Sequence, residues 1–133
     1  MRSLTILGGD LTDVGLEGLC SVSSQLTSLD ICNITKLTDE GLSHLQNLHQ
    51  LRKLRLHVNP AGELLHAVNV PRSLSKLPLL TAIELHSLRG WCGECSVMLG
   101  SMLQLQSVSL NNIDDLMDDD LECVLTMLGH SVF

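Results

Sequence analysis

Two cysteines stand three residues apart, at Cys92 and Cys95, in the string Trp91-Cys92-Gly93-Glu94-Cys95. Such a pair can carry out redox chemistry when the attacking thiolate lies at a helix N-terminus, because the helix dipole lowers the pKa of the thiol there. On this interpretation Cys92 is the nucleophile and Cys95 is the resolving thiol. Cys92 and Cys95 are therefore the candidate redox pair of the chain.

The same string resembles the WCGPC active site of thioredoxin-like oxidoreductases, and a strand expected at 81–85 precedes it. The resemblance implies a thiol oxidoreductase. It departs from the family at Glu94, which replaces the proline, and the rest of the chain does not match the thioredoxin order of strands and helices. Redox catalysis is therefore the lesser alternative. A reversible local disulfide is a second alternative, and a structural zinc site is a third, although it would need four ligands.

Two other groups have the chemistry of metal ligands. His57 and His86 are expected to be cross-strand neighbours, which is compatible with a metal pair or a pH switch, but only Glu84 is near enough to add a third ligand. We interpret them as solvated histidines.

An acidic cluster near the end of the chain lacks the ligand spacing of a calcium loop and is interpreted as a helix start favoured by the dipole. Its members are Asp114, Asp115, Asp118, Asp119 and Asp120. No metal and no cofactor is predicted.

A repeat must position these residues. The pattern L-x-x-L-x-L occurs five times, starting at residues 1, 26, 51, 80 and 105, so that the starts are 25, 25, 29 and 25 residues apart. Each copy predicts a short strand with its aliphatic side chains in a core. The copies are Met1-x-x-Leu4-x-Ile6, Leu26-x-x-Leu29-x-Ile31, Leu51-x-x-Leu54-x-Leu56, Leu80-x-x-Ile83-x-Leu85 and Leu105-x-x-Val108-x-Leu110.

The second half of each repeat predicts a helix of two to three turns. The segment LTDVGL at 11–16 recurs as LTDEGL at 37–42, and more loosely as LMDDDL at 116–121. Its threonine can cap a helix, and its aspartate then lies at the positive end of the helix dipole. In the fourth repeat Cys92 takes the place of the threonine and Cys95 that of the glycine. The third repeat is irregular, and its extra residues near 59–62 and 70–72 are expected to lengthen a turn or shift its helix.

Stacking the repeats predicts an α/β fold with a parallel sheet, its strands about 4.8 Å apart, and helices on the opposite side. Helices are wider than strands, so the stack should curve with the sheet on its concave face. We predict a single array over residues 1–133. Met1 occupies a strand position and His130 falls where the next repeat should begin, so we expect a fragment truncated at both ends.

These repeats resemble the leucine-rich-repeat superfamily, which implies a solenoid shaped as a horseshoe arc. The closest pattern is that of F-box substrate receptors, LxxLxLxxCxxITDxGLxxL, and it matches best over 26–45. That resemblance implies the substrate-recognition part of a ubiquitin ligase. The long third repeat also looks similar to repeats of NOD-like innate immune receptors, which implies a ligand-sensing or autoinhibitory segment. The chain departs from the F-box pattern at its cysteine, replaced by Gly9, Ile34, Asn59, Leu88 and Ile113.

The positions between the leucines should line the concave face, where such an array binds another protein. Arg55 is the first choice as an anchor, because arginine is enriched among the residues that dominate binding energy. Alternatively, Asp30, Arg55 and Glu84 only neutralise one another across the strands. The candidate partner-binding residues are Asp30, Arg52, Arg55, His57, Glu84 and His86.

The composition of the chain argues against several classes of protein. The chain has 8 basic and 15 acidic residues and a formal charge of −7, so its surface repels phosphate backbones and nucleic-acid binding is not expected. It has no apolar run long enough to span a membrane, no signal peptide, and an odd count of five cysteines without the framework of a secreted domain. We therefore expect a cytoplasmic location, with the nucleus as an alternative. The predicted function is protein binding rather than catalysis, and the sequence leaves the oligomeric state open.

Overall fold

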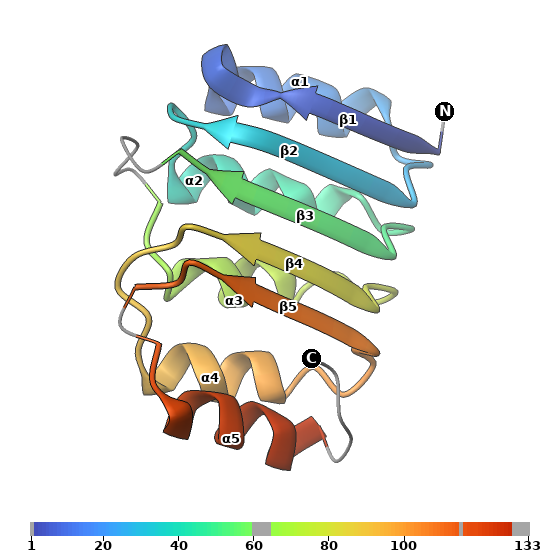
Figure 1. The fold of residues 1–133 in the computed structure, drawn as a ribbon. Helices are drawn as coiled ribbons and strands as arrows, with labels where there is room; N and C mark the ends of the chain where they lie inside the picture. The colour runs from blue at the N-terminus through green and yellow to red at the C-terminus, as the bar shows by residue number, and fades with distance from the viewer. Residues whose placement is uncertain (1, 60–64, 115, 129–133) are drawn as a thin grey trace.

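A parallel β-sheet is the central element of the computed structural model, which describes residues 2–59, 65–114 and 116–128 (Figure 1). All neighbouring strands are parallel and pair in chain order, β1-β2-β3-β4-β5. Parallel neighbours need a crossover connection, and a helix lies in each one here. The strands are β1 (Ser3–Leu7), β2 (Ser28–Ile34), β3 (Lys53–Val58), β4 (Ala82–His86) and β5 (Ser107–Asn111).

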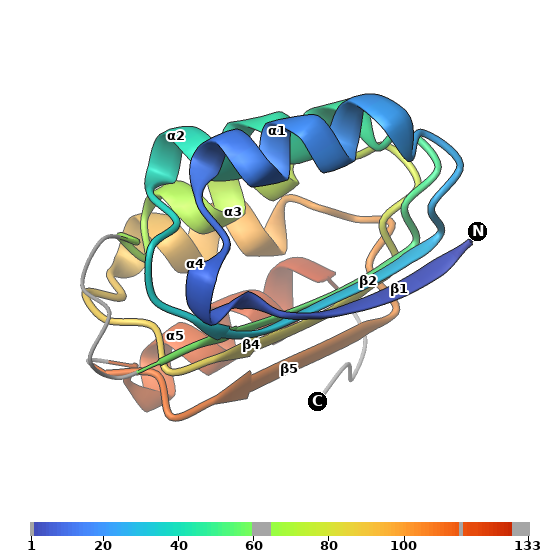
Figure 2. The same ribbon diagram turned by 90° about the horizontal axis from the view of Figure 1, so that it is seen from above.

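The helices lie together on one face of the sheet, so the molecule has two layers (Figures 1 and 2). In the described part of the chain, no helix covers the other face, which we call the open face. The predicted α/β class with a parallel sheet is confirmed. Over the same residues, no helix has the length and apolar character to cross a membrane. The helical elements are η1 (Gly8–Asp10), α1 (Asp13–Val22), α2 (Asp39–Leu42), η2 (Ser43–Asn47), α3 (Asn69–Leu74), α4 (Gly93–Gly100) and α5 (Asp118–Leu128).

The register of the sheet follows the spacing of the repeat. Ser3 pairs with Ser28, Ser28 with Lys53, Lys53 with Ala82 and Ala82 with Ser107, so partners are 25, 25, 29 and 25 residues apart. The pairing stacks equivalent aliphatic positions in a row across all five strands. The predicted strand positions are confirmed for the described residues, and Met1 lies outside them.

Leucine and isoleucine fill the space between the two layers. Leu29, Leu54, Ile83 and Val108 occupy one slot of successive repeats, and each is at most 2% exposed. Full burial of such a side chain stabilises the fold by roughly 1.5–3 kcal/mol. No repeat encloses its own leucines, so this stabilisation comes from contact between neighbouring repeats.

The helices differ more than the sequence predicts. α1 and α5 have 10 and 11 residues and match the expected two to three turns, whereas α2 has only four and passes into the 3-10 helix η2. The third repeat has its extra residues near 59–62 and 70–72, where the sequence predicts a longer turn or a shifted helix. The stretch at 70–72 lies inside α3, where Pro71 occupies the first turn and needs no backbone donor. Residues 60–64 lie outside the described part of the chain.

Threonine caps one of the two LTDxGL helices. Thr12 precedes α1, and its Oγ1 accepts a hydrogen bond from the backbone N–H of Gly15 at 3.4 Å, as predicted. Thr38 precedes α2, but its hydroxyl donates to Asp13 Oδ2 of the preceding repeat instead of capping its own helix. The prediction was therefore wrong for Thr38. Its hydroxyl donates a charge-assisted hydrogen bond to a carboxylate of the neighbouring repeat, and such a bond is stronger than the neutral bond it would accept from a backbone N–H of α2.

Candidate functional site

The open face of the sheet carries a row of charged side chains at matching positions. Asp30 pairs in register with Arg55, and Arg55 pairs with Glu84. These residues alternate along their strands with buried Leu29, Leu54 and their equivalents, since successive side chains of a strand point to opposite faces. The sheet therefore holds the three charges side by side on a surface that no described helix covers.

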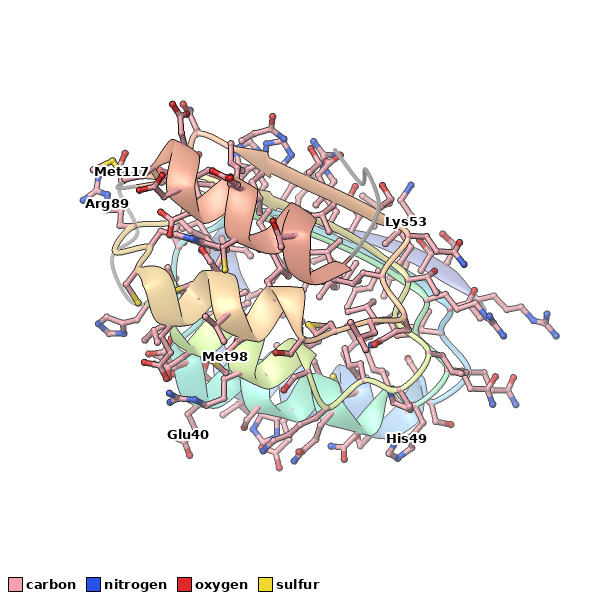
Figure 3. The ribbon with its side chains drawn as sticks, turned by 90° about the horizontal axis from the view of Figure 1, so that it is seen from below. Glu40, His49, Lys53, Arg89, Met98 and Met117 are labelled. Carbon is pink, nitrogen blue, oxygen red and sulfur yellow. The ribbon has the colours of Figure 1, made fainter. Side chains whose placement is uncertain are left out.

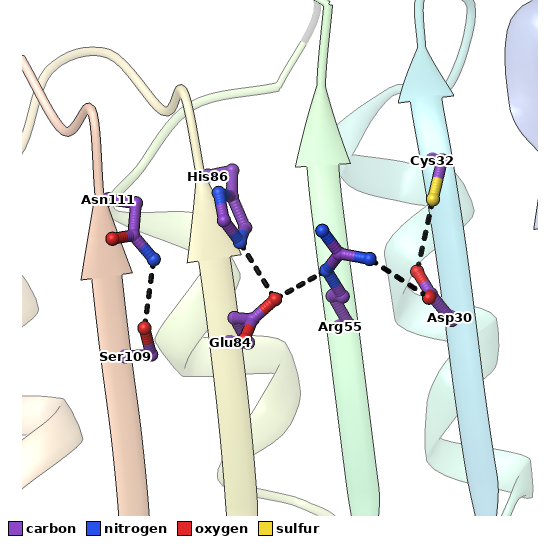
Figure 4. A network of polar contacts seen from close by, with 7 residues as sticks. All are labelled: Asp30, Cys32, Arg55, Glu84, His86, Ser109 and Asn111. Atoms are coloured by element: carbon purple, nitrogen blue, oxygen red, sulfur yellow. Dashed lines mark hydrogen bonds and ion pairs between the residues drawn. The ribbon is translucent and has the colours of Figure 1, made fainter.

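These charges form one connected network (Figure 4). Arg55 Nη1 lies 3.2 Å from Asp30 Oδ2, and Arg55 Nε forms an ion pair with Glu84. Beyond this trio, the Cys32 thiol donates to Asp30 Oδ1 at 3.2 Å, and His86 Nε2 lies 2.8 Å from Glu84 Oε2. The contacts agree with the interpretation that the charges neutralise one another across strands. Arg55 is thus held in place by two carboxylates.

Contacts within the network shift the pKa values of Arg55 and Glu84. The hydrogen bond that Arg55 donates to Asp30, together with the negative charge of Asp30, raises the pKa of Arg55. The hydrogen bond with His86 lowers the pKa of Glu84, and the charge of Arg55 lowers it further. Both shifts favour the charged forms, so Arg55 and Glu84 are charged at neutral pH.

His57 and His86 are neighbours on adjacent strands, as the sequence predicts. Their ring centroids are 5.0 Å apart, with an angle of 35° between the ring planes. No group of three or more metal-ligating side chains occurs within the ranges that the structure describes. The histidine pair therefore forms a ring contact on the open face, and His86 belongs to the charged network.

Arg52 and Lys53 lie where the third strand begins. Arg52 precedes β3, is exposed and does not belong to the network of Figure 4. Lys53 was missed in the sequence analysis, although it is exposed and lines a depression of about 460 Å³ on the open face beside Asp30, Arg55 and Glu84. The period-two alternation of a strand places residue 53 on the same face as residue 55, and this signal was available in the sequence. Figure 3 shows Lys53 at one end of the sheet and Arg89 with Met117 at the opposite end.

The cysteine pair lies away from the open face, at the start of a helix. Cys92 is the N-cap residue of α4, in the position that Thr12 has in α1, so the predicted repeat register is confirmed. Cys92 is exposed and Cys95 is fully buried, with 3.6 Å between their sulfur atoms. The backbone N–H of Cys92 donates to Cys95 Sγ at 3.5 Å, which completes one half of a capping box.

The two thiols differ in acidity. Hydrogen bonds from the backbone N–H and the side chain of Cys95 lower the pKa of Cys92. Burial raises the pKa of Cys95 to about 11. At neutral pH Cys95 is therefore a thiol, and Cys92 is the more reactive group of the two.

Buried polar contacts fix the surroundings of the pair. Trp91 is 3% exposed and its Nε1 donates to Ser96 Oγ at 2.9 Å. Ser96 Oγ in turn donates to Asp120 Oδ1 at 2.9 Å, which ties α4 to α5. Sequence analysis did not single out Ser96, because a serine at a helix position that faces the core has no distinguishing pattern.

Part of the acidic cluster begins α5. Asp118, Asp119 and Asp120 form its first turn, as predicted, and Asp120 Oδ2 accepts a hydrogen bond from the backbone N–H of Met117 at 2.9 Å. Asp114 lies 3.8 Å from the guanidinium of Arg89. Asp115 lies outside the described residues.

Comparison of the sequence with models of known protein families found no match, and a search among curated proteins also found none.

Proposed function

We propose that the chain is an array of five leucine-rich repeats, curved with its sheet inward, and that it binds another protein on the open face. The observation that carries the proposal is a sheet face that no described helix covers and that bears an ordered charged network. Uncovered parallel sheets are uncommon, because both faces are normally buried. A protein partner is a natural cover for such a face.

The network suits recognition because its side chains are already ordered. Asp30 and Glu84 hold the guanidinium of Arg55 from both sides, so a partner would lose little side-chain entropy on binding it. Lys53 adds a positive charge beside this network, and Leu7 at the edge strand is 82% exposed and offers an apolar contact. The favoured partner is a polar protein segment with a carboxylate opposite Lys53.

A capture experiment tests the binding face. The purified chain is compared with Lys53→Glu, which leaves the network of Arg55 intact, and with Arg55→Glu, which disrupts it. Arg72→Glu is the matched control, because Arg72 lies on α3 in the helix layer and pairs there with Glu94. We expect both open-face variants to bind the captured protein roughly tenfold more weakly, and the control to bind as the parent chain does. Equal binding by all four proteins would exclude the open face.

Two pathways are compatible with this proposal. The LTDxGL segments and their regular register support a substrate-recognition role in a ubiquitin ligase, whereas the longer third repeat favours ligand sensing or autoinhibition in an innate immune receptor. Expression of the chain in cells separates them. As a competitor for substrate, it should lengthen the half-life of the captured protein in the first case and leave that half-life unchanged in the second.

A further inference from the structure

The cysteine pair of α4 has a chemistry that protein binding does not use. We propose that Cys92 and Cys95 form a thiol–disulfide exchange site whose substrates are small disulfides. The site lies at the start of a helix in the helix layer and is separate from the open face. It needs no other residue to complete its chemistry, because the two sulfur atoms come from the N-cap and the first turn of α4.

The geometry of the pair supports exchange. The sulfur atoms are 3.6 Å apart, and a disulfide bond needs about 2.05 Å, so a modest rotation of the Cys92 side chain joins them. Cys92 is exposed, so an incoming disulfide can reach its sulfur. Cys95 is fully buried behind it, where it is protected from solvent but lies within reach of Cys92. One sulfur is thus placed to attack and the other to resolve.

The reaction balances in two steps. The Cys92 thiolate attacks one sulfur of a disulfide RSSR, so that a Cys92–S–S–R bond forms and the first RS⁻ leaves and takes up the proton that Cys92 lost. Cys95 Sγ then attacks Cys92 Sγ, the Cys92–Cys95 bond forms, and the second RS⁻ leaves with the proton of Cys95. Two protein thiols are oxidised to one disulfide, and RSSR is reduced to two RSH.

The surroundings favour this order of steps. The lowered pKa of Cys92 makes it the thiolate that attacks first, and the raised pKa of Cys95 keeps that thiol protonated until the mixed disulfide has formed. Arg72 Nη2 lies 3.0 Å from Glu94 Oε1 and offsets the acidic charge next to Cys92. Trp91 and Ser96 hold the first turn of α4 in place from the buried side.

Trp91 provides a direct signal for the reaction, because it is the only tryptophan of the chain and adjoins Cys92. The reduced protein is mixed with oxidised glutathione at neutral pH, and its fluorescence and intact mass are followed. We expect the parent chain to lose the mass of two hydrogen atoms, to keep no glutathione and to change its fluorescence. Peptide mapping should then locate the new bond between Cys92 and Cys95.

Two variants separate the steps. Cys95→Ser should retain one glutathione on Cys92, because the resolving thiol is gone, and Cys92→Ser should form neither the adduct nor the disulfide. Serine has the shape of cysteine with a smaller γ atom, so it fits the buried space of Cys95 without added volume, and circular dichroism of each variant checks the fold. Cys32→Ser is the control and should react like the parent chain.

Other results would overturn the proposal. They are an unchanged reaction of Cys92→Ser, a bond that maps to Cys20, Cys32 or Cys123, or a parent chain that keeps its glutathione. We expect Cys92 to react about tenfold faster than Cys32 at neutral pH, since a larger fraction of it is thiolate. Equal rates would also contradict the assignment. Because the open face is not involved, partner capture should be the same for Cys92→Ser and the parent chain, so the two proposals can fail independently.

Discussion

Asp13 accepts two hydrogen bonds from Thr38, a residue of the next repeat. Its Oδ1 accepts from the backbone N–H at 2.9 Å and its Oδ2 from the hydroxyl at 2.5 Å. Asp39 repeats the arrangement one unit later, with Oδ1 2.9 Å from the backbone nitrogen of His66. The aspartate of LTDxGL therefore begins its own helix and also fastens the loop of the following repeat.

The glycine of the same segment makes room for this contact. A Cβ at Gly41 would lie 2.0 Å from Asp13 Oδ1, so Gly41→Ala should lower the free energy of unfolding by about 1–3 kcal/mol. Asp13→Ala removes the hydrogen bonds to Thr38 and should lower it by roughly 1–3 kcal/mol. Urea unfolding of both single variants and the double variant measures their coupling.

The stability of the double variant decides whether Asp13 and Gly41 interact. With alanine at position 13 only its Cβ remains, 3.2 Å from the added methyl group, so Gly41→Ala should be less harmful in this background. Gly18→Ala is the control, because nothing lies within 4 Å of its Cβ, and it should stabilise the exposed helix by about 0.5–1 kcal/mol. Additive effects of the two substitutions would show that Asp13 and Gly41 do not interact.

The charged network should weaken in acid. Because His86 and Arg55 lower the pKa of Glu84, the ionised carboxylate stabilises the folded state at any pH above the ordinary value of 4.5. This contribution is lost as the pH falls below 4.5 and through the lower pKa of the folded state. Glu84→Gln should be less stable than the parent chain at pH 7, and the difference should shrink below pH 4.5. A difference that is independent of pH would contradict the lowered pKa.

Alkylation should separate Cys92 from Cys32. The pKa of Cys92 is lowered from 9.0 by Cys95, while burial and the hydrogen bond to Asp30 raise the pKa of Cys32. The rate of iodoacetamide labelling at Cys92 should therefore reach half its maximum below pH 9, and that at Cys32 above pH 9, as measured by mass spectrometry of the peptides. Cys95→Ala removes the side-chain hydrogen bond but keeps the backbone N–H of residue 95, so it should move the Cys92 midpoint upward only in part, and an unmoved midpoint would exclude the Cys95 side chain as a cause.

Three repeats have a left-handed backbone at one equivalent position. Asn33, Ser87 and Asn112 have φ values of 58°, 64° and 54°. Asparagine tolerates this conformation better than serine does, so Ser87→Asn should stabilise the fold by up to about 1 kcal/mol in thermal unfolding. Ser107→Asn is the control within β5 and should give no gain. A loss of stability for Ser87→Asn would show that the serine makes a contact worth more than the backbone strain.

Regular features of the chain could be predicted from the sequence, while contacts between repeats could not. The spacing of Leu29 and Leu54 predicts the strands and their register, because a parallel stack requires equivalent residues side by side. The hydroxyl of Thr38 turns to Asp13 only because the loops of neighbouring repeats are close in space. No local pattern encodes that distance.

The candidate sites show the same division. Strand alternation predicts the row of Asp30, Arg55 and Glu84. The same alternation also places Lys53 on this face. Which nitrogen of Arg55 meets which carboxylate depends on side-chain geometry that sequence does not give. The C-x-x-C spacing identified Cys92 and Cys95, but the exposure of the first and the full burial of the second come only from the packing of α4 on the sheet.

The alternation of each strand divides its residues into two independent sets. Positions such as Leu54 and Leu56 determine whether the protein folds, whereas Lys53, Arg55 and His57 project from the opposite side and displace no core volume. Surface changes of the second kind usually alter stability by less than about 0.5 kcal/mol, apart from residues in a charged network. A library that varies Thr5, Lys53, Ser107 and Ser109 could therefore redirect this scaffold to new targets without redesign of its interior.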